Sequence, residues 1–368
     1  MDEMEEVGPD VWEKEWREGI LDNVSSLVLY STNDCKHDDD GSAQFDNPVG
    51  VTVDKLNNIY VADSGNHRIR KITPDGVVST LAGVGETDFL LGSFRDGIGT
   101  REAQFNSPTD VAIDSLGNVY VADSFNDRIR KIAPDGWVST FAGSMQGFKE
   151  SAGTMAKFNH PISVSVDTED NVYVVDEYNN RIRKITPDGW VSTFAGKGDY
   201  SCQHGISKKA GFKSLYSVVV DSADNVYVAD SFNQRIYKIT PDEVVNILAG
   251  NGRQGFKDGV STEVQFRYPS GVTVDTENNV YVADTGNNRI RKITPDGMVS
   301  TLAGNKMGFE DGFGTEARFN HPRNVAVDAS RNVYVADTRN YRIRKITSDG
   351  VVTTIAGCGT QGHKDSNF

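Results

Sequence analysis

The sequence predicts an all-β fold, a six-bladed β-propeller of four-stranded antiparallel blades, and three observations support this. One long pattern recurs six times along the 368 residues, and the arginine of its Asn-x-Arg-Ile motif falls at Arg68, Arg128, Arg181, Arg235, Arg289 and Arg342, at intervals of 60, 53, 54, 54 and 53 residues. Each copy contains four short stretches rich in β-branched and aromatic residues, separated by Gly, Pro, Asn and Asp. A repeated four-stranded meander leaves unpaired edges unless its units are arranged radially, as in a propeller.

The first copy shows how one blade is built. Residues 49–53 alternate large and small side chains and residues 59–62 are β-rich, so the two stretches predict a hairpin. Residues 68–72 alternate again after a second turn. Pro74-Asp75-Gly76 then supplies a tight turn, and residues 77–81 make a fourth strand. We expect the first strand of each copy to line the axis and the fourth to lie outermost.

The predicted division of the chain is an N-terminal extension at 1–44, the propeller at 45–357 and a C-terminal tail at 358–368. In the extension, Trp12, Trp16 and Ile20 recur at the spacing of one helix face, which indicates a short amphipathic helix. Residues 23–27 resemble a fourth strand. This segment and residues 351–355 therefore compete for closing the ring, and the sequence leaves that choice open.

The chain is acidic, with a formal net charge of −14. This charge opposes the phosphate backbone, so nucleic acid is not expected as a partner. The three cysteines are too few for a disulfide framework in a domain of this size. An acidic start and the lack of a long apolar stretch argue against a signal peptide and a membrane span. We therefore expect a soluble chain in the cytoplasm or elsewhere inside the cell, without a cofactor and with its oligomeric state open.

Two stretches carry a family resemblance. Residues 61–69 read Val-Ala-Asp-Ser-Gly-Asn-His-Arg-Ile, and residues 282–290 read Val-Ala-Asp-Thr-Gly-Asn-Asn-Arg-Ile. The chain resembles the NHL-repeat β-propellers over about residues 45–357, in all six copies. The resemblance implies a propeller that serves mostly as a binding platform, although related six-bladed propellers include metal-dependent lactonases and a peptide-amidating lyase. A shared fold does not choose among these roles.

Residues common to every copy are assigned to the scaffold. Each copy has an aspartate at the end of its second strand, and the six are Asp63, Asp123, Asp176, Asp230, Asp284 and Asp337. A residue present in every blade is expected to bond the backbone of its own turn. These aspartates are therefore not predicted to act in catalysis.

Function is expected where the copies differ. In an up-and-down blade, the turns between second and third strands lie on the same face as the loops between blades. Three successive copies have an aromatic residue in this turn, where the others have Gly65, Gly286 and Arg339. Apolar and aromatic side chains gathered on polar loops are typical of a recognition surface. We therefore predict a non-enzymatic platform for a protein or peptide partner, contacted by Phe125, Tyr178, Phe232, Phe89, Leu90, Tyr200 and Tyr216.

The alternative is a metal-dependent hydrolase or lyase at the mouth of the central channel. His160 and His321 occupy the same position in copies three and six, and Asp110 and Asn324 are expected on the axial side of their strands. Carboxylate and imidazole groups of this kind can hold a metal ion that activates water. However, copies three and six lie on opposite sides of the axis, too far apart for shared ligands, and no metal site is predicted. The histidines then only fill a loop position held elsewhere by Asn47, Ser107 and Tyr268.

Overall fold

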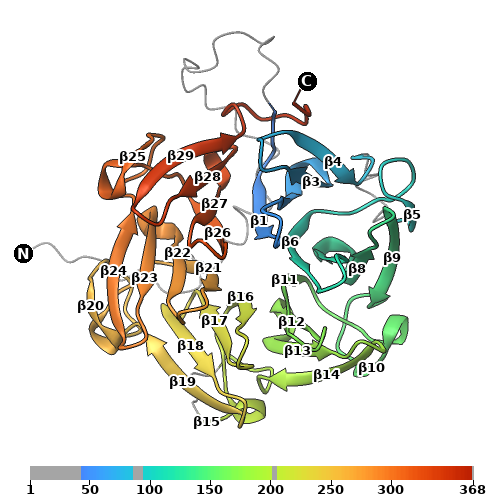
Figure 1. Cartoon of the computed structure of the whole chain (residues 1–368). Helices are drawn as coiled ribbons and strands as arrows, with labels where there is room; N and C mark the ends of the chain where they lie inside the picture. The colour runs from blue at the N-terminus through green and yellow to red at the C-terminus, as the bar shows by residue number, and fades with distance from the viewer. Residues whose placement is uncertain (1–42, 86–93, 201–204, 367–368) are drawn as a thin grey trace, which may run out of the picture. The chain divides into compact units, whose positions relative to one another are not determined.

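The computed structural model describes residues 43–85, 94–200 and 205–366, all within the compact unit His37–Phe368. These residues form six antiparallel sheets around one axis, with the strands of each sheet ordered from the centre to the rim (Figure 1). The predicted all-β, six-bladed propeller is confirmed. Among the described residues, the structure has no helix that is long and apolar enough to cross a membrane.

Each blade contributes four strands in chain order. The first strands, next to the axis, are β1 (Pro48–Val53), β6 (Pro108–Ile113), β11 (Pro161–Val166), β16 (Leu215–Val220), β21 (Pro269–Val274) and β26 (Pro322–Val327). The second strands are β2 (Ile59–Asp63), β7 (Val119–Asp123), β12 (Val172–Asp176), β17 (Val226–Asp230), β22 (Val280–Asp284) and β27 (Val333–Asp337). The third strands are β3 (Arg68–Ile72), β8 (Arg128–Ile132), β13 (Arg181–Ile185), β18 (Arg235–Ile239), β23 (Arg289–Ile293) and β28 (Arg342–Ile346). The fourth strands are β4 (Val78–Ala82), β9 (Trp137–Ala142), β14 (Trp190–Ala195), β19 (Val244–Ala249), β24 (Met298–Ala303) and β29 (Val351–Ala356).

Five blades have a further two-residue strand outside the fourth strand, which the sequence analysis did not predict. These edge strands are β5 (Gly97–Ile98), β10 (Ser151–Ala152), β15 (Gly205–Ile206), β20 (Gly259–Val260) and β25 (Gly312–Phe313). Each comes from the loop that precedes its blade. In blade 2, Asp96 lies directly before β5, pairs with Arg130 at 2.6 Å and accepts a hydrogen bond from the amide of Thr140 at 3.1 Å. This carboxylate therefore holds the loop against the fourth strand.

The sheets are buried on both faces because each packs between two neighbours. All five residues of β7 are buried. The core between blades 1 and 2 joins Ala62 and Ile69 of blade 1 to Val111 and Val121 of blade 2. One phenylalanine per blade, from the loop before the first strand, is at most 1% exposed: Phe45, Phe105, Phe158, Phe212, Phe266 and Phe319. Since every core is shared between blades, no blade buries its apolar side chains alone.

A buried ion pair links the second and third strands in five blades, at 2.8 to 2.9 Å: Asp63–Arg70, Asp123–Arg130, Asp176–Arg183, Asp284–Arg291 and Asp337–Arg344. In blade 2, Asp123 also accepts a hydrogen bond from the amide of Asn106 at 2.7 Å. Arg130 donates to the carbonyls of Gln104 and Arg95, at 2.9 and 2.8 Å. The pair therefore joins two strands to the loop before the first strand, a scaffold role of the kind expected for the repeated aspartates.

Blade 4 lacks the arginine of this pair. Tyr237 stands in its place, with its ring edge-on to Phe212 at a centroid distance of 5.7 Å. Asp230 still accepts hydrogen bonds from the amides of Lys213 and Ser214, both at 3.0 Å. Burial raises the pKa of Asp230 above its ordinary value. The backbone bonds to the aspartate are thus kept when the cation is absent.

The C-terminal segment 358–366 closes the ring by taking the place of the missing edge strand of blade 1. Asp365 pairs with Arg70 at 2.6 Å, as Asp96 does with Arg130 in blade 2. The amide of Gly362 donates to the carbonyl of Phe45 at 3.1 Å. These contacts lie in the connection between blades 6 and 1, and in the described part of the chain the four main strands of every blade are consecutive.

Of the two segments expected to compete for closure, residues 351–355 lie in β29, where they pair with β28 of the same blade. Residues 23–27 lie outside the described residues. The helix predicted around Trp12 and Trp16 also lies outside them.

We expect Arg291→Leu to lower the free energy of unfolding by about 3–5 kcal/mol, because it leaves the carboxylate of Asp284 buried without its partner. Urea unfolding at neutral pH, followed by circular dichroism, measures this loss. Arg331→Leu is the matched control, since Arg331 pairs with Glu277 at the surface and such exposed pairs contribute about 1 kcal/mol or less. Equal losses in the two variants would contradict the role given to the buried pair.

Ending the chain at Gly357 should lower the free energy of unfolding by about 1–3 kcal/mol, because buried donors of Arg70 lose their acceptors. Hydrogen exchange should quicken first in β3 and β4, which contact the removed segment. Deletion of residues 367–368 alone is the control. Unchanged protection of blade 1 in the shorter chain would show that the segment does not close the ring.

Candidate functional site

One face of the propeller is formed by the turns between second and third strands together with the loop residues just before the first strands. Main-chain hydrogen bonds join the two sets: the amide of Tyr178 donates to the carbonyl of Asn159 at 3.2 Å, and that of Gly286 to Arg267 at 2.8 Å. We call this surface the turn face. In five blades the turn is a 3₁₀ helix: η1 (Ser64–Asn66), η2 (Ser124–Asn126), η4 (Glu177–Asn179), η7 (Thr285–Asn287) and η9 (Thr338–Asn340).

The backbone of these turns is nearly identical from blade to blade. The residue that follows each of the five 3₁₀ helices is left-handed, with φ between 48° and 55°. The middle residue of the turn therefore varies without a change of backbone. The side chains that differ among blades, rather than the turn geometry, distinguish one part of the turn face from another.

Three rings form one cluster over blades 2 and 3. The ring of His160 stacks on that of Tyr178, with centroids 4.8 Å apart and an interplanar angle of 12°. The ring of Phe125 meets that of His160 edge-on, at a centroid distance of 5.0 Å. Phe125 and Tyr178 remain 44% and 42% exposed, whereas His160 is 8% exposed. The structure thus brings two of the predicted contact residues together through a histidine assigned to the alternative site.

Glu177 holds this histidine in place. Its Oε2 lies 2.7 Å from Nδ1 of His160, and both residues are buried. Nε2 of His160 is buried without a hydrogen-bond partner among the described residues. In blades 2, 4, 5 and 6 the residue at the position of Glu177 is instead a hydroxyl that donates to a carbonyl of the next blade: Ser124 to Pro161, Ser231 to Pro269, Thr285 to Pro322 and Thr338 to Pro48. Among blades 2 to 6, only blade 3 therefore has a carboxylate in place of the hydroxyl at this turn position.

Phe232 belongs to a second cluster. Its ring meets that of Tyr268 edge-on at 5.7 Å, and Nζ of Lys213 lies 5.9 Å from its centroid. Tyr216, on β16, accepts a hydrogen bond from the guanidinium of Arg323, on β26, at 3.1 Å. None of the ring contacts within the described ranges includes Tyr200, which is 56% exposed. Phe89 and Leu90 lie outside the described residues.

Asp110 joins three first strands at the axis. Its carboxylate accepts hydrogen bonds from Oγ of Ser163 at 2.7 Å and from Nδ2 of Asn324 at 3.0 Å. Gly50 makes this approach possible, since a Cβ there would lie 2.5 Å from Cα of Asp110. Burial raises the pKa of Asp110 to about 7, against the opposing effect of the hydrogen bonds it accepts. Asp110, Ser163 and Asn324 thus form a hydrogen-bonded group across the axis of the propeller.

The four residues of the alternative reading fall into separate hydrogen-bonded groups. Asp110 bonds Asn324, whereas His160 lies against Glu177 and Nδ1 of His321 lies 3.0 Å from Oδ1 of Asn320. Both histidines have a left-handed φ, as do their counterparts Asn47, Ser107 and Tyr268. Among the residues that the structure describes, no three His, Cys, Asp or Glu side chains are placed to hold a metal ion.

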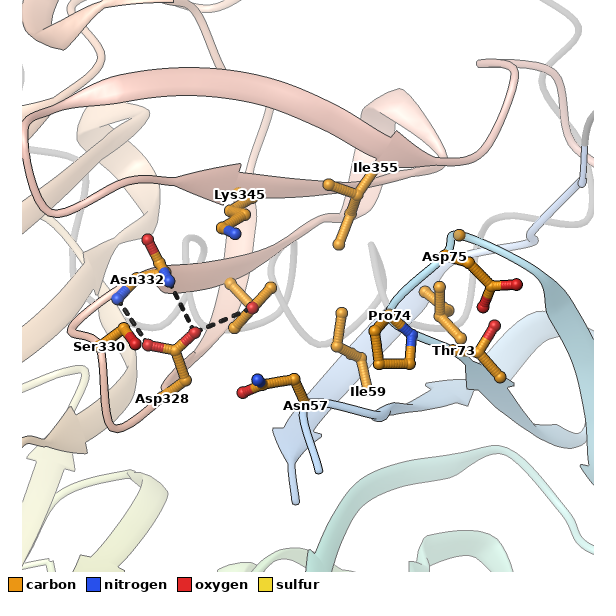
Figure 2. A pocket seen from close by; sticks show the side chains of 13 residues that line it. Asn57, Ile59, Thr73, Pro74, Asp75, Asp328, Ser330, Asn332, Lys345 and Ile355 are labelled. Atoms are coloured by element: carbon orange, nitrogen blue, oxygen red, sulfur yellow. Dashed lines mark hydrogen bonds between the residues drawn. The ribbon is translucent and has the colours of Figure 1, made fainter. Parts of the chain in front are cut away.

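A pocket of about 330 Å³ lies between blades 6 and 1, at the turns of the opposite face. Figure 2 shows Asp328, Ser330 and Asn332 on one side of it and Asn57 and Pro74 on the other. Asp328 is already bonded, by the amide and side chain of Asn332 and by the hydroxyl of Tyr334. Equivalent aspartates bond the same partners in other blades, as Asp54 and Asp275 do. The polar groups of this pocket are therefore those of the scaffold.

Four charged residues at turn-face positions were not predicted from the sequence: Glu177, Arg267, Arg323 and Arg339. Two of them differ in charge from their counterparts in other copies. Glu177 replaces Ser or Thr, and Arg267 replaces Asp, Asn or Lys at the equivalent position. Such a change of charge between copies marks a turn-face residue as clearly as an aromatic side chain does.

Comparison with known proteins gives a consistent result for the repeats. The family model described as NHL repeat matches residues 45–72, 105–132, 158–185, 266–293 and 319–346. These are the five copies that have the buried Asp–Arg pair. The fourth copy, with Tyr237 in place of the arginine, lies between the matched ranges.

Two curated relatives cover most of the chain. Protein SUPPRESSOR OF QUENCHING 1, chloroplastic, of Arabidopsis thaliana is 29% identical over 325 residues, which is 81% of this chain and 30% of the relative. NHL repeat-containing protein 2 of Homo sapiens is 30% identical over 341 residues, which is 81% of this chain and 46% of the relative. The chain thus spans less than half the length of either protein.

Among solved structures, a protein of unknown function from Bacteroides thetaiotaomicron is 22% identical with a TM-score of 0.64, over 85% of this chain and 71% of that one. Virginiamycin B lyase from Staphylococcus aureus is 14% identical with a TM-score of 0.51, over 86% and 85% of the two chains. Similarity at this level shows a shared fold alone.

The raised pKa of Asp110 predicts a specific pH dependence. An acid with a higher pKa in the folded than in the unfolded chain makes folding less favourable as the pH rises between the two values, here from about 4 to about 7. Asp110→Ser introduces the residue found at the equivalent position of blades 3 and 4, Ser163 and Ser217. In this variant, the decrease in stability caused by ionisation of Asp110 should be absent. The free energy of unfolding of the variant should therefore improve relative to wild type across this range, as urea unfolding at several pH values would measure. Parallel pH profiles for the two proteins would contradict this account.

Proposed function

Since this chain is an NHL-repeat β-propeller, we propose that it acts as a non-enzymatic interaction platform, which binds a protein or peptide partner on the turn face. The observation that carries the proposal is the cluster of Phe125, His160 and Tyr178. Two aromatic rings there are close to half exposed although a buried histidine fixes their positions. Rings that are rigid before binding lose little conformational freedom when a partner covers them.

The cluster combines the two properties expected of a contact surface. The exposed edges of Phe125 and Tyr178 offer apolar area, which gains free energy when it leaves water. The Glu177–His160 contact beneath them restricts the ring of His160, on which Tyr178 stacks. Phe232, Tyr216 and Tyr200, with Phe89 and Leu90 of the loop into blade 2, complete the proposed contact set.

A protein or peptide is the partner class that this surface favours. Nucleic acid remains disfavoured by the net charge of −14. We also propose an intracellular location, which agrees with the low cysteine content of the chain and with the name of the relative SUPPRESSOR OF QUENCHING 1, chloroplastic. No cofactor is part of this proposal.

The test is a quantitative pull-down from cell lysate with wild type beside Phe125→Ala/Tyr178→Ala. We expect the double variant to lose a protein that wild type captures, by about tenfold or more, because truncating central aromatic residues removes most of the binding energy of an interface. Circular dichroism and thermal unfolding first establish equal folding. The adjoining Phe232→Ala exchange then locates the edge of the site.

The matched control is Trp137→Ala/Trp190→Ala. These tryptophans begin the fourth strands of the same two blades, β9 and β14, and each is 50% exposed. Loss of two exposed aromatic rings is thus common to both double variants, whereas only one of them changes the turn face. Equal capture by the two variants, or no specific capture by wild type, would refute the proposed face.

The second candidate is a hydrolase or lyase that acts near Asp110, His160, His321 and Asn324. One observation favours it: His160 is oriented by Glu177 and has a buried Nε2 without a partner in the described part of the chain. An imidazole held by a carboxylate is a frequent general base. Stoichiometric divalent metal in protein purified without chelator would favour this candidate over the platform.

A further inference from the structure

Three arginines lie near His321 on the turn face at blades 5 and 6. These blades lie across the axis from blades 2 and 3, which carry Phe125 and Tyr178 (Figure 1). Arg267 precedes the first strand of blade 5, Arg323 is the second residue of β26, and Arg339 is the middle residue of the turn η9. Arg267 and Arg339 are exposed, and Arg323 is half-buried. We refer to these three residues as the arginine cluster.

Hydrogen bonds connect the segments that carry the cluster. The amide of Gly286 donates to the carbonyl of Arg267 at 2.8 Å, and the amide of Arg339 donates to the carbonyl of Asn320 at 3.1 Å. The amide of His321 donates to Oδ1 of Asn288 at 2.9 Å. The turn of blade 5, the loop before β26 and the turn of blade 6 are therefore tied together, so the three arginines are attached to one rigid part of the scaffold.

The side chain of Arg267 packs against Gly286 in the turn of blade 5, where there is no room for a Cβ atom. A Cβ at this position would lie 2.6 Å from Cγ and 2.7 Å from the carbonyl oxygen of Arg267. The equivalent residues of blades 2, 3 and 4 are the aromatic Phe125, Tyr178 and Phe232. The middle turn residue is thus an aromatic ring in blades 2, 3 and 4, whereas in blade 5 it is a glycine that leaves space for the aliphatic part of Arg267.

The cluster has no carboxylate partner in the described part of the chain. The buried arginines of five blades pair with aspartates, and the surface Arg331 pairs with Glu277. Within the described ranges, no ion pair includes Arg267, Arg323 or Arg339. Their charges are therefore not neutralised by an ion pair within the part of the chain that the structure describes.

Electrostatic effects agree with this proximity. Burial and the charges of Arg339, Arg323 and Arg267 lower the pKa of His321 to about 4, so this histidine is neutral at physiological pH. Burial and the charge of Arg323 also lower the pKa of Arg339. An anion placed among the three guanidinium groups would relieve this mutual repulsion.

We propose that the arginine cluster, together with the hydroxyl of Tyr216, binds a carboxylate of a peptide partner. This inference rests on the proposed platform function and adds the chemistry of its partner: a segment with an acidic residue beside apolar ones. The guanidinium group matches the two oxygens of a carboxylate. Tyr216 lies on β16 of blade 4, the blade that also carries Phe232, and accepts a hydrogen bond from Arg323 of blade 6, so it connects the aromatic residues to the arginine cluster.

The rest of the turn face favours an acidic peptide over a nucleic acid. Blades 1 and 2 carry half-buried carboxylates there, on Asp46 and Asp127, and the carboxylate of Glu177 in blade 3 is buried against His160. A continuous phosphate backbone crossing the face would meet these charges after leaving the cluster, whereas a peptide with one acidic group would not. Three arginines suit one or two carboxylates rather than an extended track of phosphates.

The experiment is a phage selection with a random dodecapeptide library on the immobilised full chain, followed by fluorescence anisotropy with the most enriched peptide. We expect enrichment of Asp or Glu near an aromatic or aliphatic residue. Arg339→Glu and Arg267→Glu should each weaken binding of this peptide by about tenfold or more, because each replaces a favourable charge with a repulsive one. Replacing the acidic residue of the peptide by its amide should cause a similar loss in wild type and little further loss in the variants.

Arg101→Glu is the matched control. Arg101 is an exposed arginine in the loop after β5 that forms no ion pair within the described ranges, so this variant has the same net charge as the other two. It should bind the peptide as wild type does. Equal weakening by all three exchanges would show an effect of net charge alone and would overturn the arginine cluster as a site.

The remaining outcomes separate this inference from the proposed function. Enriched peptides without acidic residues, bound by Arg339→Glu but not by Phe125→Ala/Tyr178→Ala, would overturn the carboxylate site and leave the platform intact. Absence of any enrichment would overturn both. Binding of fluorescein-labelled oligouridine that is lost in Arg339→Glu, without peptide enrichment, would replace the peptide by RNA.

Discussion

In five of the six blades, the architecture depends on the buried contact between an aspartate at the end of the second strand and an arginine of the third strand. The attraction of the two charges is offset by the cost of removing them from water. The pair therefore contributes to the fold mainly by ordering the backbone groups that it bonds. The carboxylate accepts an amide from the loop before the first strand, and the guanidinium donates to carbonyls of that loop. In blade 1 the same arginine binds the C-terminal segment, so one device both builds the blades and closes the ring.

Because the scaffold uses recurrent residues, the copies can diverge elsewhere without a loss of fold. The 3₁₀ turns of five blades keep one backbone conformation, whether their middle residue is glycine, an aromatic residue or arginine. A ring of six similar blades thus becomes asymmetric in its surface chemistry. Exposed aromatic rings and an oriented histidine lie over blades 2 and 3, and the three residues of the arginine cluster lie over blades 5 and 6.

The sixfold pattern was enough to predict the fold, since strand lengths, turns and blade number all follow from one well-defined repeat. The edge strands escaped prediction because two residues carry no periodicity, and their pairing depends on a carboxylate that meets a buried arginine far along the chain. The same cause hid the closing segment, although Gln361-Gly362-His363-Lys364-Asp365 repeats the pattern Gln254-Gly255-Phe256-Lys257-Asp258. At the candidate site, the aromatic turn residues were recognised from sequence. The contact between His160 and Glu177 joins a loop to a turn 17 residues later, and only the structure shows it.

The two ends of the propeller meet in the connection between blades 6 and 1, so the ring could be opened at another such connection. The segments 43–46 and 358–366 together correspond to one ordinary connection between blades, such as the one that joins β24 to β26. In the described part of the chain, the four main strands of each sheet are consecutive in sequence, and only the edge of blade 1 is covered by a segment from the other end. A circular permutation that joined these segments and opened another connection would therefore preserve every strand pairing within the blades. Any of the six repeats could therefore come first in the sequence without a change in the arrangement of the blades.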